Sequence, residues 1–89
     1  MEKKENEIVL EVILVAGVIN STGKMLYWKT DIPVYIGDYA IVENMNGYDL
    51  IKVVGLVRTK ETMASKFSNT KYENMKKVVD AISEGIIKQ

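Results

Sequence analysis

Clusters of turn-forming residues divide this chain into short apolar runs. Asn20-Ser21-Thr22-Gly23 follows one run, Gly37-Asp38 precedes another, and Asn46-Gly47 separates two more. Asn-Gly is the strongest two-residue signal for a β-hairpin, because both residues tolerate a positive φ. A parallel crossover needs a dozen or more connecting residues, and these connections are shorter. The turn spacing therefore predicts an antiparallel, strongly bent sheet or a small open barrel.

The runs between these turns have the composition of β-strands. They are rich in Ile, Val and aromatic residues, which fit a pleated and packed surface. The predicted strands are Ile8–Ile19, Met25–Lys29, Tyr39–Glu43 and a fourth from Tyr48 to about Arg58. Gly17 is expected at a bulge or bend, and Gly55 lets the fourth strand bend sharply. At Met63–Phe67 the pattern leaves a fifth strand and a helical turn equally open.

The last segment has the pattern of an amphipathic helix. Thr70-Lys71-Tyr72-Glu73 fits a capping box, with Thr70 as the N-cap. Apolar residues then recur at steps of three and four, as on one face of a helix; they are Tyr72, Met75, Val79, Ile82 and Ile86. The 89 residues predict a single domain, with a β-barrel core over 8–67 and a C-terminal helix over 70–88.

The composition excludes most enzyme classes. The chain has no Cys and no His, so it lacks disulfides, thiolate ligands and the commonest catalytic base. No phosphate-binding glycine motif is present. The acidic residues Asp31, Asp38, Glu43 and Asp49 match no metal loop and are expected to be solvated turn carboxylates, with Asp38 bonding its own turn. We therefore expect no enzymatic activity, no cofactor and no bound metal.

The most apolar stretch, Ile8–Ile19, is too short for a membrane span. It has twelve residues and contains Glu11, whereas a span needs about 20 apolar residues. The preceding residues mix Glu with Lys and lack the positive region of a signal peptide. These features predict a cytoplasmic protein with no membrane partner.

Five of the seven aromatic side chains fall within 22 positions: Tyr27, Trp28, Tyr35, Tyr39 and Tyr48. They are candidate binding residues, because such side chains stack on bases, Pro-rich peptides or cations. The alternative is that several of them simply pack the barrel. Neighbours on a strand face opposite sides, so Tyr27 and Trp28 cannot both point inward.

Charge is divided unevenly, although Lys+Arg and Asp+Glu number 12 each. Residues 1–57 carry a net charge of −3 and residues 58–89 a net charge of +3. The candidate basic face is Arg58, Lys60, Lys66, Lys71, Lys76 and Lys77. Beside an aromatic groove it would suit nucleic acid. The alternatives are an ordinary solvated surface and head-to-tail association of two subunits.

Three segments carry a resemblance to a known group of proteins. They are Tyr27-Trp28-Lys29-Thr30-Asp31, Gly37-Asp38-Tyr39-Ala40-Ile41-Val42 and Val53-Val54-Gly55-Leu56-Val57. The chain resembles small uncharacterised phage and prophage proteins of Gram-positive bacteria that have an SH3-like barrel core. The resemblance implies an SH3-like open barrel of four to five strands. The predicted C-terminal helix is additional to this barrel, so the expected fold is mainly β with α. It also implies a place in the cytoplasm of a bacterial host cell.

The function expected from these features is a non-enzymatic binding module of phage or prophage origin. Exposed barrel edges would engage a protein partner or a second copy in a homodimer, by strand addition. The alternative is a nucleic-acid-binding SH3-like barrel that uses the aromatic groove and the basic 58–77 face.

Overall fold

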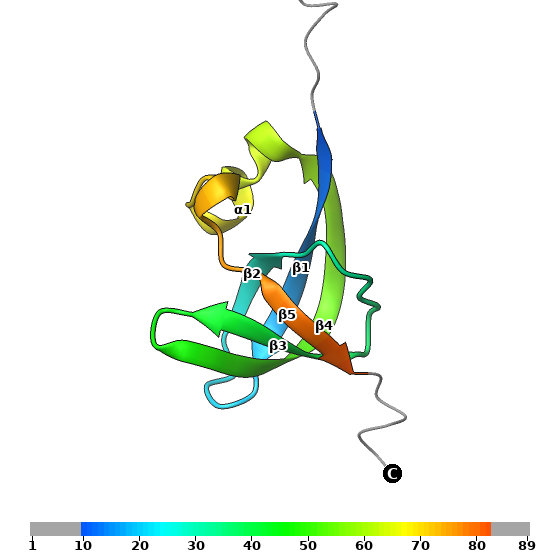
Figure 1. Cartoon of the computed structure of the whole chain (residues 1–89), viewed down its shortest axis with the longest axis vertical. Helices are drawn as coiled ribbons and strands as arrows, with labels where there is room; N and C mark the ends of the chain where they lie inside the picture. The colour runs from blue at the N-terminus through cyan, green and yellow to red at the C-terminus, as the bar shows by residue number, and fades with distance from the viewer. Residues whose placement is uncertain (1–9, 83–89) are drawn as a thin grey trace, which may run out of the picture.

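Five antiparallel strands form one open sheet, in the order β2-β1-β4-β3-β5 (Figure 1). The computed structural model describes residues 10–82. The strands are β1 (Glu11–Ile19), β2 (Met25–Lys29), β3 (Tyr39–Asn44), β4 (Gly47–Lys60) and β5 (Val78–Ile82). The mainly β, antiparallel prediction is confirmed over these residues. The assignment to SH3-like barrels stays a prediction.

Both predicted hairpins are present, but the second turn lies one residue earlier than the predicted Asn46-Gly47. β1 pairs with β2 across the Asn20–Gly23 turn, where Gly23 has φ 77°. β3 pairs with β4 across Met45-Asn46, and Gly47 has φ 136°. The predicted first strand begins at Ile8, which lies outside the described residues.

The two halves of β4 pair with two different strands. Its residues Gly47–Lys52 pair with β3, and Ile51–Lys60 pair with β1. The register shifts where Ala16 faces Gly55 and Gly17 faces Val53, so Val54 is the extra residue of a bulge. Such a bulge bends the strand and increases its twist. The irregularity expected at Gly17 and Gly55 is therefore confirmed, and its extra residue belongs to β4.

The predicted C-terminal helix is wrong over residues 70–82. A 3₁₀ turn, η3 (Tyr72–Asn74), is followed by β5, which pairs with β3. The Thr70 hydroxyl donates to the Ser68 carbonyl at 3.4 Å and makes no capping box. β3 would otherwise leave a row of backbone groups unpaired, and pairing with Val78–Ile82 satisfies them. The remainder of the predicted helix, 83–88, lies outside the described residues.

The segment after β4 is helical. η2 (Glu61–Met63) and the one-turn helix α1 (Ser65–Ser68) follow directly on the strand. Asn69, with φ 59°, ends α1 in the left-handed conformation. At Met63–Phe67 the structure thus has a helical turn and not a fifth strand. In the residues described, no helix has the length and hydropathy of a membrane span.

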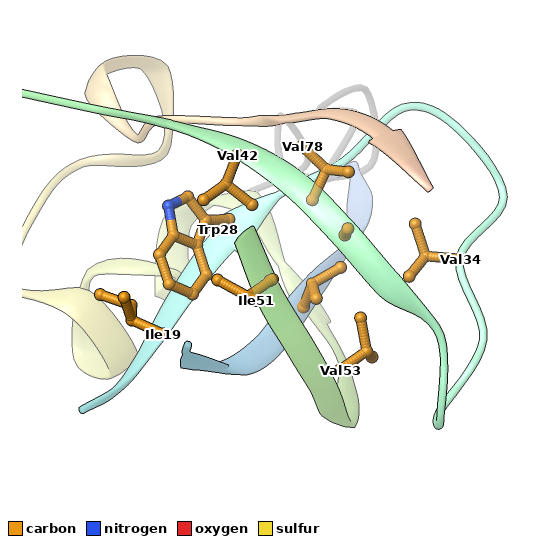
Figure 2. Close-up of a cluster of buried hydrophobic side chains, with 9 residues drawn as sticks. Ile19, Trp28, Val34, Val42, Ile51, Val53 and Val78 are labelled. Atoms are coloured by element: carbon orange, nitrogen blue, oxygen red, sulfur yellow. The ribbon is translucent and has the colours of Figure 1, made fainter. Parts of the chain in front are cut away.

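Two apolar clusters lie on opposite faces of the sheet. The inner cluster contains side chains from all five strands and the β2–β3 loop (Figure 2): Val15, Ile19, Trp28, Val34, Ala40, Val42, Ile51, Val53 and Val78. The outer cluster is Leu14, Ala64 and Met75, with Val12, Tyr27, Val57 and Tyr72 packed against it. Leu14 and Val15 are neighbours on β1, which is why they serve different clusters.

The sheet curls until its two edge strands meet at one point. The Lys29 amide donates to the Lys76 carbonyl at 3.0 Å, and the Glu43 amide donates to the Lys77 carbonyl at 3.0 Å. The residues just before β5 therefore bridge β2 and β3. Beyond this bridge, towards Met25, nothing in residues 10–82 pairs with the outer side of β2.

Candidate functional site

A hollow of about 440 Å³ lies along β2 beyond this bridge. It is bounded by β2, the β3–β4 hairpin and the segment that runs from α1 to Lys76. Four of its apolar side chains are exposed: Met25 by 49%, Leu26 by 46%, Phe67 by 39% and Met45 by 84%. Met45 reaches this exposure because it stands at the hairpin tip.

Trp28 forms part of the wall of the hollow. Its side chain is only 4% exposed and belongs to the inner cluster. The indole Nε1–H donates to the Glu43 carbonyl at 3.1 Å, which ties β2 to β3. The hollow therefore has a rigid apolar side, since the largest residue there is held by both packing and a hydrogen bond.

Among residues 10–82, no strand pairs with the backbone groups that the outer edge of β2 presents to this hollow. In an antiparallel pair, residues alternate between bonding the neighbour strand and pointing away from it. The Ile19 amide donates to the Lys24 carbonyl at 2.8 Å, so Lys24 is a position that bonds β1. Every second residue after it, Leu26 and Trp28, therefore also bonds β1. Met25, Tyr27 and Lys29 point outward, and the Lys29 amide shows this by its bond to Lys76.

The polar rim of the hollow carries two carboxylates and one ammonium group. Glu43 and Asp49 come from the β3–β4 hairpin, and Lys76 comes from the bridge to β5. Glu43 Oε1 accepts from the Lys77 amide at 3.4 Å, and the Asn44 side-chain amide donates to Asp49. These contacts hold negative charge at the hairpin end of the hollow.

The five candidate aromatic residues are not gathered in one groove. Trp28 and Tyr27 line the hollow, and the Tyr27 ring lies 5.5 Å from that of Phe67. Tyr39 lies on β3, where the Lys52 ammonium is 4.5 Å from its ring centre. Tyr35 lies in the loop before β3, and Tyr48 begins the β4 side of the hairpin; they are 68% and 67% exposed.

The candidate basic residues do not share one surface: five of them line four different hollows that also contain acidic residues, and Lys66 lines none of these. Arg58 and Lys60 share theirs with Glu11, and Arg58 lies 3.9 Å from the Glu11 carboxylate. Lys71 lies with Glu61 and Glu73, and Lys77 lies with Asp31. Lys76 lines the hollow beside β2, whereas Lys66 is exposed on α1. Their role as a basic face stays a prediction.

Lys29 fastens η3 to the end of β2. Its ammonium donates to the Tyr72 carbonyl at 3.0 Å and the Glu73 carbonyl at 3.3 Å, and lies 4.9 Å from the Tyr72 ring centre. Burial raises the pKa of the Tyr72 hydroxyl, and the nearby negative charges of Glu61 and Asp31 raise it further.

Of the carboxylates expected in turns, Asp38 lies in one, whereas Glu43 lies on β3 and Asp49 on β4. Asp38 Oδ2 accepts from the Tyr35 amide at 3.0 Å, which confirms the expected bond to its own turn. Within residues 10–82, no three acidic side chains gather closely enough to hold a metal ion.

Sequence reasoning missed the exposed apolar side chains of the hollow. Met25, Leu26, Met45 and Phe67 come from three separate segments, and only the folded chain brings them together. One signal was available, because the apolar Met45 adjoins the turn-forming Asn46-Gly47; in the structure it is itself a turn residue, at a position where a polar residue is usual.

Comparison of the chain with protein-family models, with curated proteins and with solved structures found no match in any of the three.

Proposed function

We propose that this protein is a small, non-enzymatic binding module whose site is the hollow beside β2, and that it engages a protein partner there. The observation that carries the proposal is the group of exposed apolar side chains around the hollow, led by Met45. Apolar side chains that surround a hollow and are rimmed by polar groups are typical of interaction sites. Self-association through the same surface is the variant in which the partner is a second copy.

Nuclease-treated bacterial lysate passed over the immobilised protein tests the proposal. We expect a protein band that the wild type retains and that the double variant Leu26→Ser, Met45→Ser loses, because the apolar wall of the hollow is then polar. The matched control is Ile36→Ser, which removes an apolar side chain that is 64% exposed and lies outside this hollow. Equal retention by wild type and the double variant would contradict the proposed site.

Self-association is tested on the purified protein by light scattering during gel filtration over a dilution series. We expect a dimer that dissociates on dilution if the partner is a second copy, and that weakens in the same double variant. A monomer at all concentrations, together with a retained lysate protein, would assign the hollow to a different partner.

Nucleic-acid binding is the alternative function, and phage or prophage origin stays an expectation that accompanies either one. Lys76 lies in the hollow beside Tyr27, but the other basic candidates lie elsewhere. Binding to nucleic acid would weaken steeply with salt and with charge reversal at Lys66, Lys71 and Lys76. Retention that disappears with nuclease would favour this alternative.

A further inference from the structure

We propose that the occupant of the hollow is an extended peptide segment of the partner, which adds to the outer edge of β2 as a further strand. This inference rests on the proposed function and states how the partner is held. The surface is an edge of the sheet, and edge strands are templates for pairing with another chain.

The first support is that the chain already uses this edge in the same way. Lys76 and Lys77 lie between β2 and β3 and bond the Lys29 and Glu43 amides, in parallel with β2. Had the chain continued straight before Lys76, it would lie beside Tyr27 and Met25. Instead η3 turns away, and Met75 is buried in the outer cluster. The added strand would lie beside Tyr27 and Met25, where a straight continuation of the chain before Lys76 would have been.

The second support is that the two faces of the edge both offer apolar contacts. Met25 and Tyr27 project to the outer face, while Leu26 and Trp28 project to the inner face. An added strand places its side chains alternately on these two faces. Apolar side chains of the peptide therefore meet apolar side chains of β2 on whichever of the two faces they lie.

The third support is the charge at the hairpin end of the hollow. Of its charged lining residues, Glu43 and Asp49 are acidic and Lys76 is basic. A Lys or Arg side chain in the partner would complement the two carboxylates. The inferred partner is therefore a short, extended, mainly apolar segment with a basic residue near Glu43 and Asp49. Its interface is small, as in weak and transient complexes.

The test uses a phage-displayed library of randomised ten-residue peptides as the probe. We expect enriched peptides that combine β-branched or aromatic residues with one Lys or Arg. A synthetic enriched peptide should slow hydrogen exchange at the Met25 and Tyr27 amides, because each gains a backbone partner. No enrichment, or binding that leaves both amides unprotected, would overturn the inference.

The backbone hydrogen bond between β2 and the peptide can be removed from either side, by a proline in β2 or by N-methylation of the peptide. Met25→Pro deletes an outward N–H at the first residue of β2, where proline is tolerated. The matched control, Met25→Val, keeps the N–H. We expect Met25→Pro to bind the peptide about tenfold more weakly than Met25→Val, a loss of about 1.4 kcal/mol, because both variants lose the Met25 side chain and only Met25→Val keeps the N–H. If Met25→Pro does not fold, N-methylation of alternate peptide residues tests the same bond on the wild-type protein.

These outcomes separate the inference from the proposed function. A lysate partner that depends on Leu26 and Met45 but binds Met25→Pro unchanged would keep the function and overturn the strand addition. The same library selected on the Glu43→Gln variant tests the charge argument. Enriched peptides that no longer favour Lys or Arg would support it, and peptides that favour them as before would contradict it. If neither the lysate nor the library yields a ligand, both proposals fail.

Discussion

Gly17 lies on β1 directly against the side chain of Ile51 on β4. A Cβ atom at this position would lie 2.4 Å from Ile51 Cδ1. Ile51 is fully buried, and its Cβ atom would also lie only 3.2 Å from the added atom. Glycine is therefore required here for a close approach between strands, not for a special φ.

We expect Gly17→Ala to lower the free energy of unfolding by about 1–3 kcal/mol, because it overpacks the interior. Gly55→Ala is the matched control, since its Cβ would lie 3.6 Å from Ala16 Cβ, an ordinary contact. Urea denaturation of both variants measures the difference. Equal stability of the two variants would contradict the close approach.

Trp28 is the largest side chain of the inner cluster. From the sequence we expect Trp28→Ala to spare the fold if Trp28 is a groove residue. Its burial and its bond to Glu43 reverse that expectation. Trp28→Ala should cost about 3–5 kcal/mol, while Trp28→Phe should cost less because it keeps an aromatic ring. Thermal unfolding followed by circular dichroism ranks the two; a Trp28→Ala protein as stable as wild type would remove Trp28 from the core.

At the scale of elements, the hairpins follow from local sequence and β5 does not. Asn46-Gly47 and Asn20–Gly23 act through the backbone angles of a few residues, so each turn is encoded where it occurs. The segment 72–82 was predicted helical from apolar spacing. The structure buries Val78 and leaves its neighbour Val79 45% exposed, as expected of successive residues on a strand paired with β3.

η3 supplies a pH-dependent contribution through Tyr72. Its folded-state pKa is raised above the unfolded value of about 10, so the folded protein favours the neutral hydroxyl. This contribution is fully present below about pH 10 and is lost as pH rises through the raised pKa. We expect unfolding free energy to fall more steeply above pH 10 in wild type than in Tyr72→Phe.

Denaturant titrations at several alkaline pH values measure this difference. Tyr72→Phe is a suitable comparison, because it keeps the ring beside Lys29 and leaves lysine titration common to both proteins. Parallel pH profiles for the two proteins would show that Tyr72 does not contribute.

At the scale of the whole molecule, one sheet separates two cores. The inner cluster is enclosed by the curled strands, and the outer cluster fastens α1 and η3 to the opposite face. The two clusters draw on three common strands, β1, β2 and β4, but share no side chain, so we expect them to respond to mutation separately.

We therefore expect Met75→Ala and Val53→Ala to destabilise additively, within about 0.5 kcal/mol, because they belong to different clusters. Val42→Ala combined with Ile51→Ala is the comparison within the inner cluster, where the losses should not add. Denaturant unfolding of the single and double variants measures both cycles. A large interaction energy between Met75 and Val53 would mean that the two cores act as one.

The sequence alone determined the antiparallel arrangement, both hairpins, the position of the β4 irregularity and the bounds of β2. These features depend on residues close together in the chain, such as Asn46-Gly47 and the β-branched runs. The tertiary structure decided that 78–82 is a strand, that Trp28 is buried and that Met25, Leu26, Met45 and Phe67 surround one hollow. Each of those outcomes depends on a distant partner: β3 for β5, Glu43 for Trp28, and three separate segments for the hollow. The residue pattern of a short segment cannot predict such partners, because which side chains are buried and which strand edges pair depend on how the whole sheet curls.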